Sequence, residues 1–301
     1  MLLPTVLDAP ARRLSATAQS YVRLTKPRVV ELLLVTAVPP MVLAARGWPA
    51  LRLVVAVLVG GALAAGGANA INCWIERDRD QVMRRTHNRP LPAGEIDPTS
   101  ALVFGIALNV VAFVFLTAET NLLAACLTLA ATLFYVFVYT IWLKPRTVQN
   151  IVIGGAAGAV PALVGWAAVT DRVSAPAWVL FLVVFCWTPA HFWALALKYR
   201  EDYAAAGIPM LPVVRGVAAT TRGILRYAVL TVAVTLTLGL FTDVGAIYLG
   251  VAGLAGLVFI GAAVQLVRDG DPKRAIRFFG WSNLYLMLVF VAVAADTLVF
   301  R

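Results

Sequence analysis

Nine apolar segments, each about 20 residues long, follow one another along this 301-residue chain and decide what it can fold into. A helix needs about 20 mostly apolar residues to cross the hydrocarbon core of a bilayer. Charged residues make up only 13% of the chain, against roughly 25% in soluble proteins. We therefore predict an all-α polytopic membrane protein rather than a soluble enzyme. The predicted spans are 28–45, 51–75, 98–117, 121–142, 148–169, 176–197, 222–241, 245–266 and 279–299.

The distribution of basic residues predicts how these spans are oriented. Of the 25 lysines and arginines, 21 lie in the N-terminal segment and in every second loop after it, and 4 lie on the other side. Cytoplasmic loops carry such an excess, so we expect a cytoplasmic N-terminus and an external C-terminus. A nucleic-acid-binding protein would gather its basic residues on one solvated face or arm. The net charge of +10 therefore indicates membrane topology and a lipid bilayer as partner, not nucleic acid.

A polar motif follows the second span. Asn72, Glu76 and Asp80 are four residues apart, and no helix breaker occurs before Pro90. A helix that continues past the span places all three side chains on one face. Mg²⁺ binds carboxylates together with the phosphate oxygens of substrates, so we predict a Mg²⁺ site at the inner mouth of the bundle. The alternative is a solvated loop whose charges pair with one another and with lipid headgroups.

Basic residues near this motif are candidates for phosphate binding. Arg84, Arg85 and Arg89 follow Asp80, and Lys144 lies in the short fourth loop. Arginine binds phosphate through two parallel hydrogen bonds. Lys144 fits equally well as a positively charged anchor at the membrane surface.

A second group of polar residues follows the sixth span. On a continuous helix His191, Lys198 and Asp202 would share one face, because they are seven and then four residues apart. A lone histidine in a membrane is often a polar contact within the protein, so a ligand-binding role is one of two interpretations. The glycines of the fifth span predict close helix packing; they are Gly154, Gly155, Gly158 and Gly165.

Six stretches carry a resemblance to a known family: 24–28, 72–80, 85–92, 139–144, 149–155 and 198–212. They resemble the motifs of the UbiA-type intramembrane prenyltransferases, and within that superfamily the branch that farnesylates protohaem IX. The first motif has Glu76 where that family has aspartate. In the second motif only Asp202 matches an acidic pair of the wider superfamily, since Lys198 occupies the earlier position.

The resemblance implies a fold, a reaction and a set of site residues. The fold is a UbiA-type bundle, and the reaction moves a farnesyl group from farnesyl diphosphate to a vinyl group of haem b, with Mg²⁺ as cofactor. It implies catalytic roles for Asn72, Glu76, Asp80, Lys198 and Asp202, with Asp202 as a further metal ligand. It also implies diphosphate binding by Lys198 and haem binding by His191. Haem A synthase or a terminal oxidase would use the product.

We expect residues 1–301 to form one membrane domain, with residues 1–20 as a disordered tail. The long, charged loops at 76–97 and 198–221 predict an active site on the cytoplasmic face of the cell inner membrane. Three alternatives remain open from the sequence. They are a related prenyltransferase with a 4-hydroxybenzoate or naphthoate acceptor, a membrane transporter, and a structural membrane subunit.

Overall fold

The computed structural model describes residues 8–300, and every regular element in that range is helical. Within these residues, nine helical segments are long and apolar enough to cross a membrane, and each overlaps one predicted span. The prediction of an all-α membrane protein is confirmed. The helices are α1 (Asp8–Thr25), α2 (Pro27–Val35), α3 (Val38–Ala45), α4 (Leu51–Val82), α5 (Pro98–Glu119), α6 (Leu122–Leu133), a π-helical segment (Phe134–Leu143), α7 (Asn150–Thr170), α8 (Ala175–Lys198), α9 (Arg200–Ala205), α10 (Leu211–Val214), α11 (Gly216–Leu236), a 3₁₀ segment (Thr237–Leu240), α12 (Ala246–Asp269) and α13 (Pro272–Phe300).

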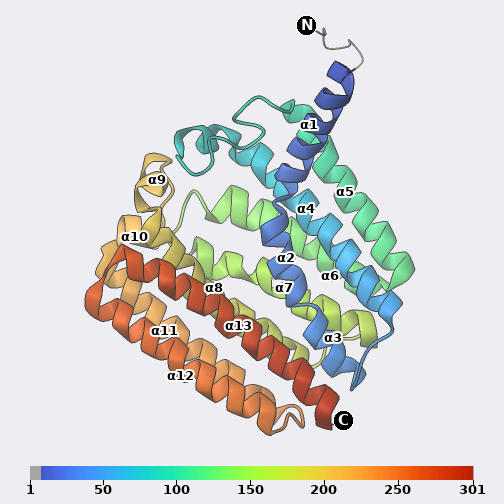
Figure 1. Ribbon diagram of the computed structural model, residues 1–301, viewed down its shortest axis with the longest axis vertical. Coiled ribbons are helices and arrows are strands. Elements are labelled where there is room, and N and C mark those ends of the chain that lie inside the picture. The colour runs from blue at the N-terminus through green and yellow to red at the C-terminus, as the bar shows by residue number, and fades with distance from the viewer. Residues whose placement is uncertain (1–7, 301) are drawn as a thin grey trace, which may run out of the picture.

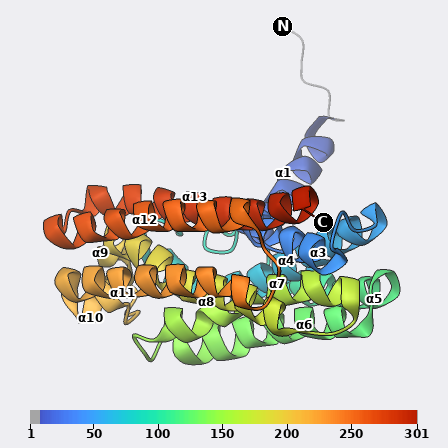
Figure 2. The ribbon, with the colours of Figure 1, turned by 90° about the horizontal axis from the view of Figure 1, so that it is seen from below.

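The long helices lie side by side in a closed bundle (Figure 1). Each packs against its neighbours in the chain, and α13 closes the bundle by packing against α3 and α8. Seen from below in Figure 2, α12 and α13 form one edge of the bundle and α6 lies at the opposite edge. The largest buried apolar cluster belongs mainly to α7, α8 and α11–α13.

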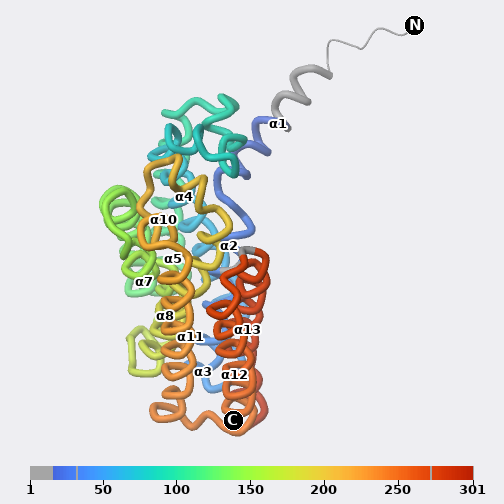
Figure 3. The backbone as a smooth tube through the Cα atoms, turned by 90° about the vertical axis from the view of Figure 1, so that its left-hand side faces the viewer, coloured from blue at the N-terminus to red at the C-terminus, as the bar shows by residue number. Residues whose placement is uncertain are grey.

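The ends of the bundle differ. The loop between α4 and α5 and the short helix α9 lie at the end from which α1 projects, and the last turn of α13 lies at the other end (Figure 3). An odd number of spans produces this separation. The structure thus places the two long, charged loops together, as the alternation of basic loops predicts.

The outer surface of the bundle is apolar. Leu254 and Leu257 on α12 are 71% and 70% exposed, and Val103, Val110 and Val114 on α5 are also exposed. A soluble monomer rarely presents continuous apolar faces of this kind. Such faces are stable in contact with the hydrocarbon tails of lipids.

The first span is interrupted, and a glycine lets α7 pack closely against the interruption. α2 ends at Val35 and α3 begins at Val38, and the backbone at Ala37 between them lies close to Gly165 of α7. A Cβ atom on Gly165 would collide with the carbonyl oxygen of Ala37, and one on Gly154 would collide with the ring of Tyr139. The prediction that glycines of the fifth span allow close packing is confirmed at these positions.

The expected tail of residues 1–20 is helical from Asp8 onward, and residues 1–7 lie outside the described range. Contacts to the loop before α5 explain why the end of α1 is ordered. Ser20 Oγ donates to Glu95 at 2.5 Å, and Arg23 forms an ion pair with the same carboxylate at 2.9 Å. The hydrogen bond from Ser20 and the ion pair with Arg23 lower the pKa of Glu95.

Candidate active site

The polar face of α4 lies inside the bundle. Because no proline interrupts it, α4 continues without a break to Val82, so Asn72, Glu76 and Asp80 line one cavity. They are only 2%, 3% and 2% exposed. The predicted arrangement of these residues on one helix face is confirmed. Three buried polar groups in a row need partners, since an unpaired buried charge is costly.

Each of the three has a basic partner from a different part of the chain. Lys26 Nζ donates to Asn72 Oδ1 at 2.8 Å, Lys144 forms an ion pair with Glu76, and Arg89 Nη1 lies 2.7 Å from Asp80 Oδ2. Lys26 stands between α1 and α2, Lys144 follows the π-helical segment, and Arg89 lies in the loop after α4. The tertiary structure therefore sets three basic groups against one amide oxygen and two carboxylates along one wall of the cavity.

A hydrogen-bond chain orients the amide of Asn72. Thr140 Oγ1 donates its one hydrogen to the carbonyl of Tyr135 at 2.8 Å, so it accepts from Asn72 Nδ2 at 3.2 Å. The amide oxygen of Asn72 is consequently the atom that faces Lys26. The helix thus presents oxygen atoms, and not an amide NH₂, toward the charged side of the cavity.

Two ionisable groups outside the membrane-spanning helices carry shifted pKa values. Burial alone would lower the pKa of the Arg89 guanidinium, but the carboxylate of Asp80 beside it raises the pKa overall. Burial raises the pKa of the phenol of Tyr203, which also lines the cavity. Arg89 therefore stays positively charged and Tyr203 stays a neutral hydrogen-bond donor.

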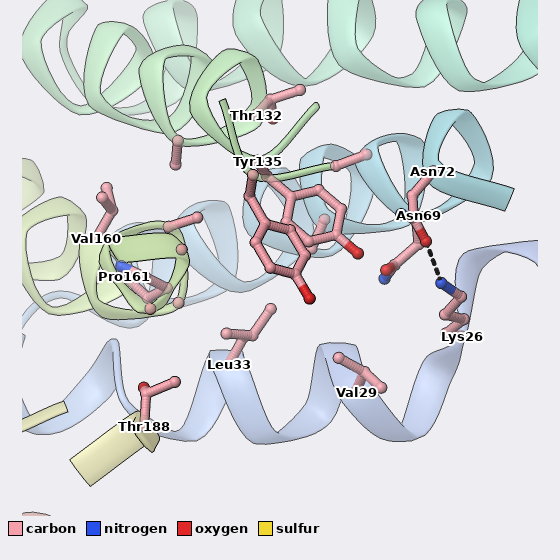
Figure 4. A pocket seen from close by; sticks show the side chains of 18 of the residues that line it. Lys26, Val29, Leu33, Asn69, Asn72, Thr132, Tyr135, Val160, Pro161 and Thr188 are labelled. Carbon is pink, nitrogen blue, oxygen red and sulfur yellow. Dashed lines mark hydrogen bonds between the residues drawn. The ribbon is translucent and has the colours of Figure 1, made fainter. Parts of the chain in front are cut away.

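The cavity is charged at one end and apolar along the rest of its length. Its volume is about 410 Å³, within the range of small-molecule sites. Figure 4 shows the hydrogen bond between Lys26 and Asn72 at one end, with Leu33, Val160 and Pro161 further along the walls. This lining suits a ligand that has an anionic head and a hydrocarbon tail.

The second predicted group is not brought together on one helix face. α8 ends at Lys198, and the backbone turns at Tyr199 (φ −102°, ψ 27°) before α9 begins. The prediction of a continuous helix through Asp202 is wrong, because Tyr199 leaves helical geometry. His191 lines the cavity, whereas Lys198 is exposed over the ring of Tyr199 and neither it nor Asp202 is among the lining residues.

Asp202 nevertheless links two loops. Its carboxylate is buried and accepts the backbone N–H of Arg85 at 3.2 Å, while Arg84 lies 3.8 Å away and also pairs with Glu201 at 3.0 Å. Arg85 lines the cavity, but Arg84 is 81% exposed at its side chain. Of the predicted phosphate-binding residues, Arg85, Arg89 and Lys144 reach the cavity wall.

Lys26 is a site residue that the sequence analysis missed. It contributed to the topology count and to the 24–28 stretch of the resemblance but was given no role in the site, yet its side chain lines the cavity and bonds Asn72. It has a left-handed backbone (φ 53°, ψ 63°) directly before Pro27, a conformation that costs a non-glycine residue about 1–2 kcal/mol. The available signal was a lysine before a helix-starting proline at the inner end of a span.

The donor set fits Mg²⁺. One amide oxygen and two carboxylates, carried by one rigid helix beside basic groups, match its preference for oxygen ligands and for a shared phosphate. Among residues 8–300, no three His, Cys, Asp or Glu side chains form a compact metal cluster. Each acidic residue of this wall is instead turned toward its basic partner.

Comparison with known proteins assigns the chain to a family. Residues 32–290 match the UbiA prenyltransferase family. The chain belongs to the UbiA prenyltransferase family.

Two relatives support a particular branch of this family. The chain is 54% identical over 294 residues to "Protoheme IX farnesyltransferase 1" of Saccharopolyspora erythraea, covering 97% of this chain and 94% of the relative. It is 51% identical over 288 residues to "Protoheme IX farnesyltransferase" of Mycobacterium avium, covering 95% and 93%.

A solved UbiA structure has the same fold. The UbiA homologue from Archaeoglobus fulgidus bound to DMAPP and Mg²⁺ superposes with a TM-score of 0.64, at 19% identity over 91% of this chain and 99% of that one. The expected UbiA-type bundle is therefore confirmed. As a member of the UbiA prenyltransferase family, the protein is a membrane-bound prenyltransferase. The two relatives named as protoheme IX farnesyltransferases share about half of its residues.

Proposed function

We propose that this protein transfers the farnesyl group of farnesyl diphosphate to a vinyl group of haem b, releasing diphosphate and giving haem O. The observation that carries the proposal is the cavity, which is charged at the face of α4 and apolar beyond it. An isoprenoid diphosphate has the same division into an anionic head and a hydrocarbon tail. The names of relatives that share half of the residues support haem as the acceptor.

The charged end would bind the diphosphate. Asn72, Glu76 and Asp80 would hold Mg²⁺, which supplies Lewis-acid stabilisation of the charge that develops on the leaving diphosphate. Asp202 of the short helix α9 is the candidate for a further metal ligand. Lys144, Arg85 and Arg89 would contact the phosphate oxygens from the cavity wall, and Lys26 joins them because it lines the same wall. Arg84 and Lys198, which lie outside the cavity lining, are further candidates for diphosphate binding.

Different residues of the protein would assist the departure of diphosphate and the attack of the vinyl group. Preorganised positive groups stabilise the departing diphosphate as it takes the electron pair of the broken C–O bond. Apolar walls keep water from the allylic cation until the vinyl carbon attacks it. Water then adds to the remaining vinyl-derived cation and loses a proton to solvent. His191 is the candidate for contact with the haem, because it lines the cavity from α8.

We further infer that residues 1–301 act as one domain in the cell inner membrane, with the active site on the cytoplasmic face. The excess of basic residues at the end that holds both charged loops supports this orientation. The product would then be delivered to haem A synthase or to a terminal oxidase.

The proposal is tested with the full-length protein in lipid nanodiscs. Incubation with haem b, farnesyl diphosphate and Mg²⁺ should give a haem whose mass has increased by one farnesyl group and one hydroxyl, and EDTA should abolish this product. Parallel reactions contain 4-hydroxybenzoate or a dihydroxynaphthoate in place of haem. Farnesylation of either of these, with none on haem, would contradict the proposal, as would unmodified haem in every reaction.

A further inference from the structure

His191 lies in a tightly defined setting on α8. Its imidazole is sandwiched between the rings of Trp187 and Phe279, with centroids 4.1 and 4.2 Å away. Its Nδ1 atom lies 2.7 Å from the hydroxyl oxygen of Ser282 on α13. The two stacking contacts determine the plane of the ring, and the contact to Ser282 determines its rotation within that plane.

The hydroxyl of Ser282 determines which nitrogen of His191 carries hydrogen. Ser282 Oγ also lies 2.7 Å from the carbonyl oxygen of Phe279, to which it donates. A hydroxyl has one hydrogen, so toward His191 the same oxygen acts as an acceptor. If the hydroxyl donated to Nδ1 instead, two acceptor oxygens would face each other at 2.7 Å. The network therefore assigns the hydrogen to Nδ1.

The position of Ser282 is itself held. Trp187 Nε1 donates to the backbone carbonyl of Ser282 at 2.8 Å, which joins α8 to α13 beside the imidazole. Ser282 is fully buried. The residue that orients His191 is thus anchored by the same tryptophan that stacks on it.

The remaining nitrogen of His191 is free for a ligand. Within residues 8–300, Nε2 takes part in no hydrogen bond, and His191 is one of the residues that line the cavity. With hydrogen on Nδ1, Nε2 carries a lone pair that no hydrogen-bond donor among the described residues occupies. A neutral imidazole with its other nitrogen bonded to a protein acceptor is the form in which histidine binds metals.

We propose that Ser282 is a positioning residue that holds His191 in the Nδ1–H form, so that Nε2 ligates the iron of the acceptor haem. This inference rests on the proposed function, because it assumes that haem enters the cavity. Partners of this kind typically contribute 10- to 100-fold to metal affinity. Ser282 would therefore determine how firmly the acceptor is held without touching it.

The test uses haem b alone with the full-length protein in nanodiscs. Titration gives the affinity, and resonance Raman and EPR spectra report whether an imidazole ligates the iron. The wild type should show the imidazole signature and His191→Ala should lose it. Ser282→Ala should bind haem roughly 10- to 100-fold more weakly with an altered iron–nitrogen signature. Ser282→Thr should recover the wild-type signature, since threonine can also bond a carbonyl one turn back.

Thr297→Ala is the matched control. Thr297 is on the same helix, is buried, and bonds the carbonyl of Val293 at 2.7 Å, but it lies about 22 Å along the axis from Ser282. It should leave haem affinity and spectra unchanged. Binding of a thiolodiphosphate analogue of farnesyl diphosphate should be equal in all variants, which shows that each one is folded.

The inference is overturned if Ser282→Ala keeps the wild-type affinity and spectra, or if His191→Ala keeps the imidazole signature. Either result leaves the proposed function intact when the wild type still farnesylates haem. An absence of farnesylated haem from the wild type overturns the proposed function instead. The two failures are therefore distinguished by the product assay on the same preparation.

Discussion

At the scale of single residues, the cavity depends on how buried charges are paired. Asp80 is 2% exposed and Arg89 neutralises it at 2.7 Å. Leaving either charge buried without the other would cost several kcal/mol. Binding of a cation to the carboxylate and of phosphate to the guanidinium would replace one pairing by another, so the site is electrostatically balanced in both states.

Asp80→Asn should reduce farnesyl transfer by about 10²- to 10³-fold, the effect of removing one group that stabilises charge in a transition state. Asparagine retains the shape and can accept from Arg89, so the protein should remain folded. Asp78→Asn is the control, because the Asp78 side chain is 82% exposed and should tolerate the change. Near-normal turnover of the Asp80 variant with Mg²⁺ present would contradict the metal assignment.

Lys26→Gln should weaken binding of the thiolodiphosphate analogue by about 10-fold, the value of one hydrogen bond to a charged group. Lys198→Gln should weaken it less, because Lys198 is exposed and lies outside the cavity lining. Calorimetric titration of both variants in nanodiscs measures the difference. An equal or larger loss in the Lys198 variant would mean that the loop after α8 folds over the diphosphate.

At the scale of helices, two irregularities shape the cavity. The interruption between α2 and α3 contributes Thr36 and Ala37 to the cavity lining, and the π-helical segment after α6 contributes Tyr135 and Tyr139. Interruptions of this kind are tolerated in membranes where the backbone is buried in protein or lines a cavity. Glycine at position 165 lets α7 approach the first of them closely.

Gly165→Ala should lower the free energy of unfolding by about 1–3 kcal/mol, the usual cost of overpacking, because the added Cβ meets the backbone carbonyl of Ala37. Thermal unfolding in detergent measures the change. Gly261→Ala in α12 is the matched control, since a Cβ there meets no atom within 4 Å and alanine has the higher helix propensity. Equal melting temperatures for both variants would show that α7 and α3 can separate at no cost.

At the scale of the whole molecule, the bundle has one end that is rich in charged residues and one end that has few of them. The loop after α4 and the segment around α9 lie together at the charged end (Figure 1). A bilayer orients such a molecule, because positively charged loops are retained in the cytoplasm. The orientation therefore determines from which compartment farnesyl diphosphate and haem would reach the cavity.

Cysteine labelling in intact cells tests this orientation. With the exposed Cys126 replaced by alanine, Arg172→Cys should react with a membrane-impermeant maleimide, whereas Asn88→Cys should react only after the cells are opened. Both positions are exposed in the structure, so accessibility reports the side of the membrane alone. The reverse pattern would place the active site outside and contradict the predicted topology.

The sequence alone determined the number of spans, the family and the common face of Asn72, Glu76 and Asp80. The spans and the common face follow from segment length and helical periodicity, which are local properties of the chain, whereas the family follows from the resemblance of its motifs. The sequence misjudged only the shared helix face of His191, Lys198 and Asp202, because a turn at Tyr199 breaks the period on which that prediction depended.

Only the tertiary structure decided which groups meet across the cavity. The partners Lys26, Lys144 and Arg89 come from three separate segments, and Ser282 reaches His191 from α13. Pairings between positions 9 to 91 residues apart depend on how whole helices pack, and no pattern within one segment carries that information.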